Sequence, residues 1–182
     1  AHKLGALSGC GALVIKEKFI DTLTPLILGG PQETFKRAGT ENLLGITSFG
    51  IAADYLQRVL TERIKKMFVH KELVTSLLEK NKSFIIQKFG SAQLCNTISL
   101  RIPEIKAQDL VVGLDLAGVN VSSGAACASG KPNPSHVLLA HGLTETEARE
   151  TIRISLEAEY AEGEIERAAG IIEKVFLSMR AN

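Results

Sequence analysis

The chain has 182 residues, enough to bury a substantial core in one domain or in one domain with part of another. Hydrophobic residues make up 45% and charged residues 23%, and a formal net charge of +1 gives no electrostatic reason to expect nucleic acid or an anionic membrane as partner. No apolar run reaches the roughly 18 residues that a membrane-spanning helix needs.

Three cysteines, Cys10, Cys95 and Cys127, lie far apart in the sequence. An odd number at wide spacing is typical of free thiols in a reducing compartment, so we expect a cytoplasmic protein without a disulfide framework or a zinc site. Cys10 and Cys95 have strand-like apolar surroundings, and we expect both thiols to be buried and structural. The chain begins at Ala1 without a methionine, which suggests the interior of a longer protein.

The first regular segment that the sequence predicts is a short buried strand over residues 9–16, behind a glycine turn. His2 and Lys3 are expected at a turn ahead of this strand. A lysine in such a position is usually only solvated, but a lysine beside a histidine at a strand edge could also bind an aldehyde cofactor as a Schiff base. Both interpretations stay open at this point.

The segment that follows the second apolar run, residues 24–28, contains a possible anion site. Arg37, Gly39 and Thr40 could offer a guanidinium, a backbone N–H group and a hydroxyl to an anion. Alternatively, Thr40 or Asn42 caps the helix that begins next. The two interpretations are compatible.

Apolar residues recur at three- and four-residue spacing from residue 43 to about residue 78, which predicts one long amphipathic helix. Arg58, Glu62 and Lys65 belong to its polar side. A helix of this length without proline often links two domains. We expect its apolar stripe to pack against a core.

A second, compact domain is predicted to begin near Phe84. Its expected elements are strands over 83–89 and 96–102, a helix over 107–117, a strand over 119–121, a helix over 135–141, a helix opened by a capping box at Thr144 and Glu147, a strand over 151–156 and a helix over 162–180. This order indicates an α/β or α+β small domain.

Residues 121–134 are a run of small residues around one thiol, Cys127. No β-branched or large apolar side chain lies between Ser122 and Lys131, so the segment cannot pack itself against a core. Its glycines and prolines also discourage a helix. Cys127 could act as a nucleophile in its thiolate form, or it could be incidental in a flexible surface loop.

Residues 151–156 alternate between apolar and polar side chains, so Arg153 and Ser155 share one face of the predicted strand. A strand holds a guanidinium rigidly, which suits bidentate recognition of a carboxylate. The plain alternative for Arg153 is a solvated charge on an edge strand.

Four separated motifs resemble one family. They are Ala-His-Lys-Leu-Gly at residues 1–5 with Gly-Ala-Leu at 11–13, Gly-Gly-Pro-Gln-Glu at 29–33 with Arg-Ala-Gly-Thr-Glu-Asn at 37–42, Ser-Ser-Gly-Ala-Ala-Cys at 122–127, and the tail from Pro134 to Leu156. In this order they resemble the cysteine desulfurases, pyridoxal-phosphate enzymes of the class V aminotransferase group. The thiol loop is similar to the housekeeping or nitrogen-fixation type, which passes sulfur to iron–sulfur scaffold proteins.

The resemblance implies a role for each matching residue. Lys3 would bind pyridoxal 5'-phosphate and move the Cα proton of the substrate, while His2 and Thr40 would contact the cofactor phosphate, Thr40 across a dimer interface. Arg153 would bind the carboxylate of L-cysteine. Cys127 would attack the substrate sulfur and become a persulfide as alanine leaves. No metal site is expected.

The resemblance also implies an α/β fold, the C-terminal part of a fold-type I pyridoxal-phosphate transferase. Residues 1–42 would be a remnant of the large cofactor-binding domain, residues 43–80 the linking helix, and residues 81–182 the small domain with the catalytic-cysteine loop. The full-length enzyme would be a homodimer whose partners are L-cysteine and an iron–sulfur scaffold or other sulfur-acceptor protein, with no nucleic acid or membrane.

In the family, several cofactor contacts precede the lysine, and that sequence is not in this chain. We therefore expect the isolated chain to be an inactive fragment that holds the cofactor poorly. Two alternatives stay open. One is a related lyase or class V aminotransferase with another substrate, although such an enzyme has no need of the thiol loop. The other is a non-catalytic piece that only docks a sulfur-acceptor protein.

Overall fold

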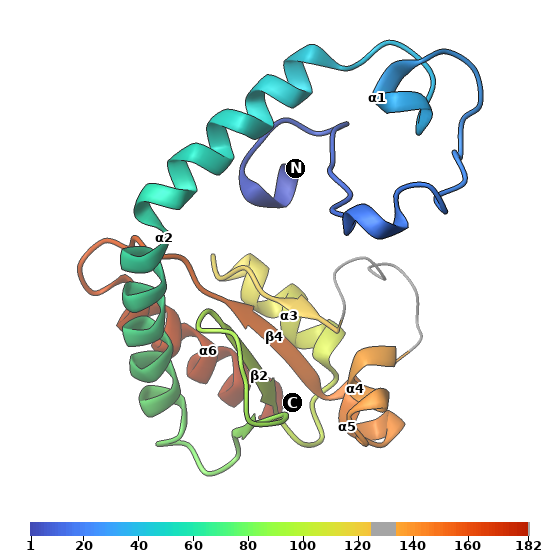
Figure 1. The fold of residues 1–182 in the computed structure, drawn as a ribbon. Coiled ribbons are helices and arrows are strands. Elements are labelled where there is room, and N and C mark those ends of the chain that lie inside the picture. Colours follow the sequence, from blue (N-terminus) through green and yellow to red (C-terminus); the bar gives the residue numbers. More distant parts are fainter. Residues whose placement is uncertain (125–133, 182) are drawn as a thin grey trace. The chain divides into compact units, whose positions relative to one another are not determined.

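The computed structural model describes residues 1–124 and 134–181, and the chain divides into two compact units, Ala1–Leu60 and Thr61–Asn182 (Figure 1). The boundary falls within one long helix, α2 (Leu43–Leu78), whose extent is the one that its apolar spacing predicted. None of the helices in the described part of the chain is long and apolar enough to cross a membrane.

The first unit consists of short helical turns, irregular chain and the beginning of α2. The turns are η1 (His2–Leu4), η2 (Glu17–Phe19) and α1 (Gln32–Phe35). The strand predicted over residues 9–16 is wrong: the segment is irregular, and Leu13 and Val14 are 74% and 95% exposed. A strand needs a neighbour with which to pair its backbone, and every strand in the described residues lies in the second unit.

Asn42 caps the start of α2, as one of the two interpretations of this segment predicted. Its Oδ1 accepts a hydrogen bond from the N–H of Gly45 at 3.1 Å, and its Nδ2 donates to the carbonyl of Gly9 at 3.5 Å. Gly45 is needed at this position because an added Cβ would lie 2.9 Å from the Cβ of Cys10. The helix start is therefore fixed against the segment that follows η1.

The second unit contains an antiparallel sheet of four strands in the order β1-β2-β4-β3. The strands are β1 (Ile85–Gln87), β2 (Thr97–Arg101), β3 (Ser122–Ser123) and β4 (Thr151–Ser155). In β4 the predicted alternation is confirmed, because Ile152 and Ile154 are buried whereas Arg153 is only partly buried. The sheet thus has one apolar and one polar face.

The strand predicted over 119–121 is displaced, since β3 comprises residues 122 and 123. The N–H of Val119 donates to the carbonyl of Leu114 at 2.8 Å, which closes the C-terminus of α3 (Ala107–Leu116) and removes that group from strand pairing. Val119 and Val121 instead pack against the core. Because pairing starts later, β3 leads directly into Gly124.

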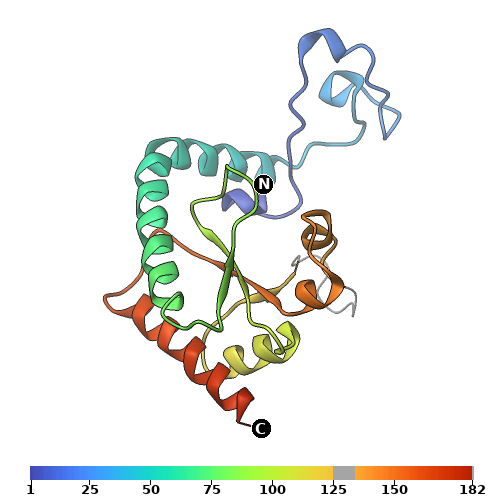
Figure 2. The same cartoon turned by 90° about the horizontal axis from the view of Figure 1, so that it is seen from below.

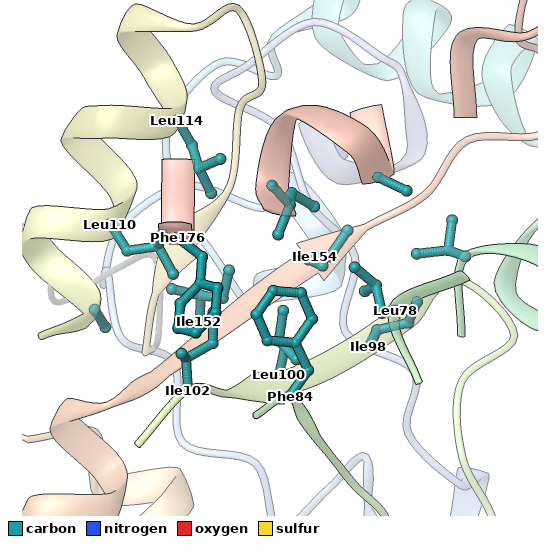
Figure 3. Close-up of a cluster of buried hydrophobic side chains, with 14 of the residues drawn as sticks. Leu78, Phe84, Ile98, Leu100, Ile102, Leu110, Leu114, Ile152, Ile154 and Phe176 are labelled. Carbon is teal, nitrogen blue, oxygen red and sulfur yellow. The ribbon is translucent and has the colours of Figure 1, made fainter. Parts of the chain in front are cut away.

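Helices α3 and α6 (Glu164–Arg180) lie side by side along the apolar face of the sheet (Figures 1 and 2). The core between them joins both helices, the central strands and the end of α2 (Figure 3). Its fully buried side chains are Leu78, Ile98, Leu100, Ile102, Leu110, Leu114 and Ile152. Helices packed on one face of an antiparallel sheet make this unit an α+β domain, one of the two classes that the order of elements indicated.

Two short helices, α4 (His136–Ala140) and α5 (Glu145–Arg149), lie between β3 and β4 in sequence. The capping box predicted at the start of α5 is confirmed: Thr144 Oγ1 accepts from the N–H of Glu147, and the carboxylate of Glu147 accepts from the N–H of Thr144. Glu147 also accepts from Arg101 of β2 at 2.6 Å. The cap therefore fastens α5 to the sheet.

The prediction that Cys10 and Cys95 are buried is wrong, because both are partly exposed. The strand before Cys95, β1, ends at residue 87, which is earlier than predicted. The strand after it, β2, begins at residue 97, which is later than predicted. Cys95 consequently lies in the loop between β1 and β2. Cys10 lies in the irregular segment of the first unit.

Replacement of Leu100 by alanine should destabilise the second unit strongly, because the side chain is completely buried at the centre of the core. We expect a loss of about 2–5 kcal/mol in the free energy of unfolding, measured by urea denaturation. Val112→Ala on the exposed side of α3 is the control and should change stability by less than about 0.5 kcal/mol. Equal effects of the two substitutions would contradict the placement of the core.

Glu147→Gln should destabilise the protein at neutral pH and much less in acid. Hydrogen bonds from the backbone and hydroxyl of Thr144 hold the pKa of Glu147 below its ordinary value. Because the folded-state pKa is the lower one, the carboxylate stabilises the fold above the unfolded pKa of about 4.3, and this contribution is lost as the pH falls through the folded-state value. Denaturation curves from pH 7 to pH 3 should show the gap between variant and wild type closing.

Glu145→Gln is the matched control for this experiment. It removes a carboxylate from the same helix, but this one is 73% exposed, and its ion pair in the described part of the chain, with Arg149, is 3.8 Å long. We expect a smaller effect at pH 7. A gap for Glu147→Gln that stays constant with pH would show that its charge is not what stabilises the cap.

Candidate functional site

The polar face of the sheet carries Arg153 near its centre. The register places Arg153 opposite Ser99 of β2 and opposite Ser122 of β3, while Ser99 lies opposite Gln87 of β1. Residues opposite each other project to the same face, so these four side chains form one row across the sheet. The hydroxyl of Ser99 donates to Oε1 of Gln87 at 2.8 Å, which orders the row beside Arg153.

Arg153 and Arg101 share this face but differ in their partners. Arg101 donates to Glu147 at 2.6 Å and to Glu150 at 2.9 Å, so two carboxylates balance its charge. Nε of Arg153 is buried without a hydrogen-bond partner, and no carboxylate in the described residues lies within salt-bridge distance of it. A buried N–H without a partner is costly, and here it belongs to a cation, so this position favours a bound anion.

A cavity of about 200 Å³ opens beside Arg153. Its wall is largely apolar, and its polar side-chain groups are hydroxyls, the imidazole of His141 and the guanidinium of Arg153. The lining residues are Phe89, Thr97, Ser99, Gly124, Ser135, Val137, Leu138, His141, Thr151, Ile152 and Arg153. A small cavity with one unpaired cation and several hydroxyls suits a small organic carboxylate.

The segment that contains Cys127 is joined to the wall of this cavity at both ends. Gly124, the last described residue before it, and Ser135, just after it, both line the cavity. Gly124 has φ of 63°, and a Cβ added to it would lie 3.0 Å from the Cβ of Ser135, so the two anchors touch. Cys127 itself lies outside the described residues.

The remaining predicted site residues belong to the first unit. His2 and Lys3 lie on η1, which ends at Gly5 with φ of 97°. The amino group of Ala1 donates to the carbonyl of Cys10 at 2.9 Å, which holds this turn against the following segment. Thr40 lies just before the cap of α2.

The three-donor anion site expected from Arg37, Gly39 and Thr40 is not formed in this arrangement. Nη1 of Arg37 donates to the carbonyls of Ala38 and Gly39 at 3.2 and 2.6 Å, so it stabilises its own loop. The N–H of Gly39 donates to Oε1 of Gln32 at 3.3 Å. Among the three groups, the hydroxyl of Thr40 is the one without a hydrogen bond in the described residues.

Of the residues that line the cavity, Arg153 alone was a predicted site residue, and Ser99, Phe89 and His141 are among those that sequence reasoning missed. The alternation of the strand over 96–102 could have placed Ser99 on the polar face, since it follows the same period of two as β4. Phe89 and His141 carry no such signal, because their contact joins the end of β1 to the end of α4. Within the described residues, no cluster of three or more metal-ligating side chains is present.

Comparison with known proteins gives a family model, Aminotransferase class-V, that matches residues 1–168. Cysteine desulfurases of Bradyrhizobium diazoefficiens and of Frankia sp. are 34% and 36% identical to the chain across 100% of it. These alignments take in 46% and 43% of those proteins, so the chain spans about half the length of the curated relatives that it matches.

Solved structures agree with this match. A NifS-like protein of Rickettsia africae is 35% identical, with a TM-score of 0.73 over 84% of this chain and 40% of that one. A second NifS-like protein is 31% identical, with a TM-score of 0.72 over 84% and 38%. The fold is therefore that of part of a NifS-like protein, and the chain belongs to the class-V aminotransferase family.

Proposed function

We propose that the chain is part of a cysteine desulfurase, which removes the sulfur of L-cysteine to give L-alanine and a persulfide on Cys127. The observation that carries this proposal is the shared cavity: the unpaired guanidinium of Arg153 and both anchors of the Cys127 segment line the same wall. The names of the relatives support the same activity.

Arg153 would hold the substrate by its carboxylate. A carboxylate supplies the acceptors that the buried Nε lacks, and a planar guanidinium binds it through two parallel hydrogen bonds. Ser99 and Ser122 flank Arg153 in the register and add no competing charge. The substrate would thus be oriented by a rigid strand rather than by a loop.

Cys127 would act on the substrate sulfur. It is three residues from Gly124, so covalent geometry alone keeps its Cα within roughly 11 Å of that anchor on the cavity wall. Its thiolate attacks the sulfur, an S–S bond forms, and the C–S bond breaks with its electron pair left on carbon. A proton delivered to that carbon completes alanine.

The first unit has the chemistry to hold pyridoxal phosphate. The side chains of His2, Lys3 and Thr40 are exposed and make no hydrogen bond or ion pair within the described residues. They offer a primary amine for an aldehyde, and an imidazole and a hydroxyl for a phosphate. When bound, this cofactor supplies an electron sink for the carbon that loses sulfur. Lys3 would move the proton at the substrate Cα.

For the complete enzyme, the proposal extends to the sulfur acceptor, the cellular compartment and the oligomeric state. Sulfur bound to Cys127 would pass to an acceptor protein, such as an iron–sulfur scaffold, because a thiol on a tethered segment can meet a second protein. The complete enzyme would work in the cytoplasm as a homodimer, with Thr40 reaching the cofactor phosphate of the other subunit.

Pyridoxal phosphate should label Lys3 selectively. In the complete enzyme mixed with pyridoxal phosphate, we expect borohydride reduction followed by peptide mass spectrometry to place the fixed cofactor on Lys3 in preference to other lysines. Lys3→Ala should lose this label, whereas Lys16→Ala, another exposed lysine of the same unit, should keep it. Even labelling of many surface lysines would contradict a cofactor role for Lys3.

Cys127→Ala should abolish persulfide formation in the complete enzyme supplied with L-cysteine and pyridoxal phosphate. The persulfide is detected as one added sulfur atom on the alkylated Cys127 peptide. Cys95→Ala, which removes a partly exposed thiol elsewhere in the same unit, should leave the persulfide and alanine release unchanged. Undiminished alanine release by the Cys127→Ala variant would remove this thiol from the mechanism.

A further inference from the structure

Gln87 lies behind the wall of the Arg153 cavity and contacts two hydroxyl groups that line it. Its Oε1 accepts a hydrogen bond from the hydroxyl of Ser99 at 2.8 Å and lies 3.4 Å from the hydroxyl oxygen of Thr151. Ser99 and Thr151 line the cavity, whereas Gln87 does not. Gln87 can therefore act on a ligand through these hydroxyls rather than by direct contact.

The hydroxyl of Thr151 has one hydrogen atom for two neighbouring acceptors. Its oxygen lies 2.7 Å from the carbonyl oxygen of Glu147 and 3.4 Å from Oε1 of Gln87. The shorter contact is the stronger hydrogen bond, so it takes the hydrogen and leaves two oxygen atoms facing each other across the longer contact. The Gln87 amide is thus only partly satisfied in the orientation that the structure shows.

A half turn of the Gln87 amide would give both hydroxyl oxygens a donor. It replaces Oε1 by Nε2, whose two N–H groups can donate to the oxygen atoms of Ser99 and Thr151. The turn breaks no other hydrogen bond, since Nε2 has no hydrogen-bond partner within the described residues. Ser99 then accepts from Gln87 instead of donating to it, so its own hydroxyl hydrogen is left over and needs an acceptor.

Ser99 is placed to give this hydrogen to a ligand of Arg153. It lies opposite Arg153 in the β2–β4 register, and both residues line the cavity. The Cβ atoms of opposite residues are about 4.5–5.5 Å apart, so one carboxylate can contact both side chains. That carboxylate supplies an acceptor for the hydroxyl of Ser99 and also the acceptor that Nε of Arg153 lacks.

We propose that Ser99 is a second donor to the carboxylate bound by Arg153 and that Gln87 is the positioning residue behind it. On binding, the Gln87 amide turns, one of its N–H groups donates to Ser99, and the hydroxyl of Ser99 donates to the carboxylate. No covalent bond forms or breaks in this change. The inference rests on the proposed function, because it takes Arg153 as the carboxylate site, and it extends that site to β2.

The test measures the dissociation constant of 3-mercaptopropionate for the 182-residue chain by NMR titration at pH 7. This compound carries the carboxylate and the thiol of cysteine without its amino group. We expect Ser99→Ala to weaken binding roughly tenfold, because a hydrogen bond to a charged group is lost. The constant is read from signals of the folded protein, so a partly unfolded variant can still be compared with wild type.

Ser155→Ala is the matched control for the loss of a hydroxyl. Ser155 lies on the same face of β4 as Arg153, but it is exposed and is not part of the cavity wall. This variant should bind the compound as wild type does. Equal affinities of Ser99→Ala and wild type, or equal losses in Ser99→Ala and Ser155→Ala, would overturn the donor role of Ser99.

Gln87→Glu tests the positioning role. A carboxylate at this position accepts hydrogen bonds but cannot donate them at pH 7, so it keeps the hydrogen of Ser99 turned away from the ligand. We expect weaker binding, with a loss several-fold smaller in the Ser99→Ala background, where the added charge acts but the hydroxyl is absent. Equal losses in both backgrounds would show that Gln87 does not act through Ser99.

The side-chain amide signal of Gln87 provides a readout that a merely structural role would not move. We expect this signal to shift as 3-mercaptopropionate is added to wild type and to stay in place when the compound saturates Ser99→Ala. The signal is assigned by its absence from the spectrum of Gln87→Glu. A signal that stays in place while wild type binds the compound would overturn the turn of the amide.

Arg153→Gln separates failure of this inference from failure of the proposed function. If wild type does not bind the compound, or if Arg153→Gln binds it equally well, the carboxylate site is wrong and the role of Ser99 is wrong with it. If binding requires Arg153 but not Ser99, this inference alone is wrong and the proposed carboxylate site stands.

Discussion

The guanidinium of Arg153, partly buried on the sheet with its Nε buried and no carboxylate of the described residues beside it, is the constraint on which the site depends. A cation in such a position is stabilised by an anion, and the flanking hydroxyls of Ser99 and Ser122 cannot neutralise it. Arg101 lies on the same face of the sheet, but its charge is neutralised within the fold by Glu147 and Glu150. Arg101 therefore joins α5 to the sheet, whereas Arg153 has no neutralising partner among the described residues.

The register of the sheet determines which side chains project to the polar face and which to the core. A slip of one residue in the β2–β4 pairing would send Arg153 into the apolar core and Ile152 and Ile154 to the polar face. The burial of those two isoleucines against α3 and α6 therefore fixes the direction in which Arg153 projects. The core and the ligand site are in this way two consequences of one hydrophobic pattern.

The sequence predicted those features that arise from local periodicity or capping. Residues 151–156 and 43–78 have clear periods of two and of about 3.6, and Thr144 with Glu147 carries its own capping signal. The strand predicted over residues 9–16 is wrong for the opposite reason. An apolar run can indicate a strand, but it does not show whether a second strand is present to pair with it. Likewise, no local pattern in the sequence predicts that Phe89 stacks on His141, because that contact depends on where β1 and α4 end in space.

The cavity joins a rigid element to a tethered one, and each suits its task. A carboxylate is best bound by a group whose position is fixed, and β4 provides this for Arg153 through pairing on both sides. In the proposed function, the nucleophile reaches a substrate and then offers sulfur to a second protein, a task that suits a thiol tethered between two anchors. The contact between Gly124 and Ser135 brings the two described ends of that segment together at the cavity wall, and Cys127 is only three residues from Gly124 in the sequence.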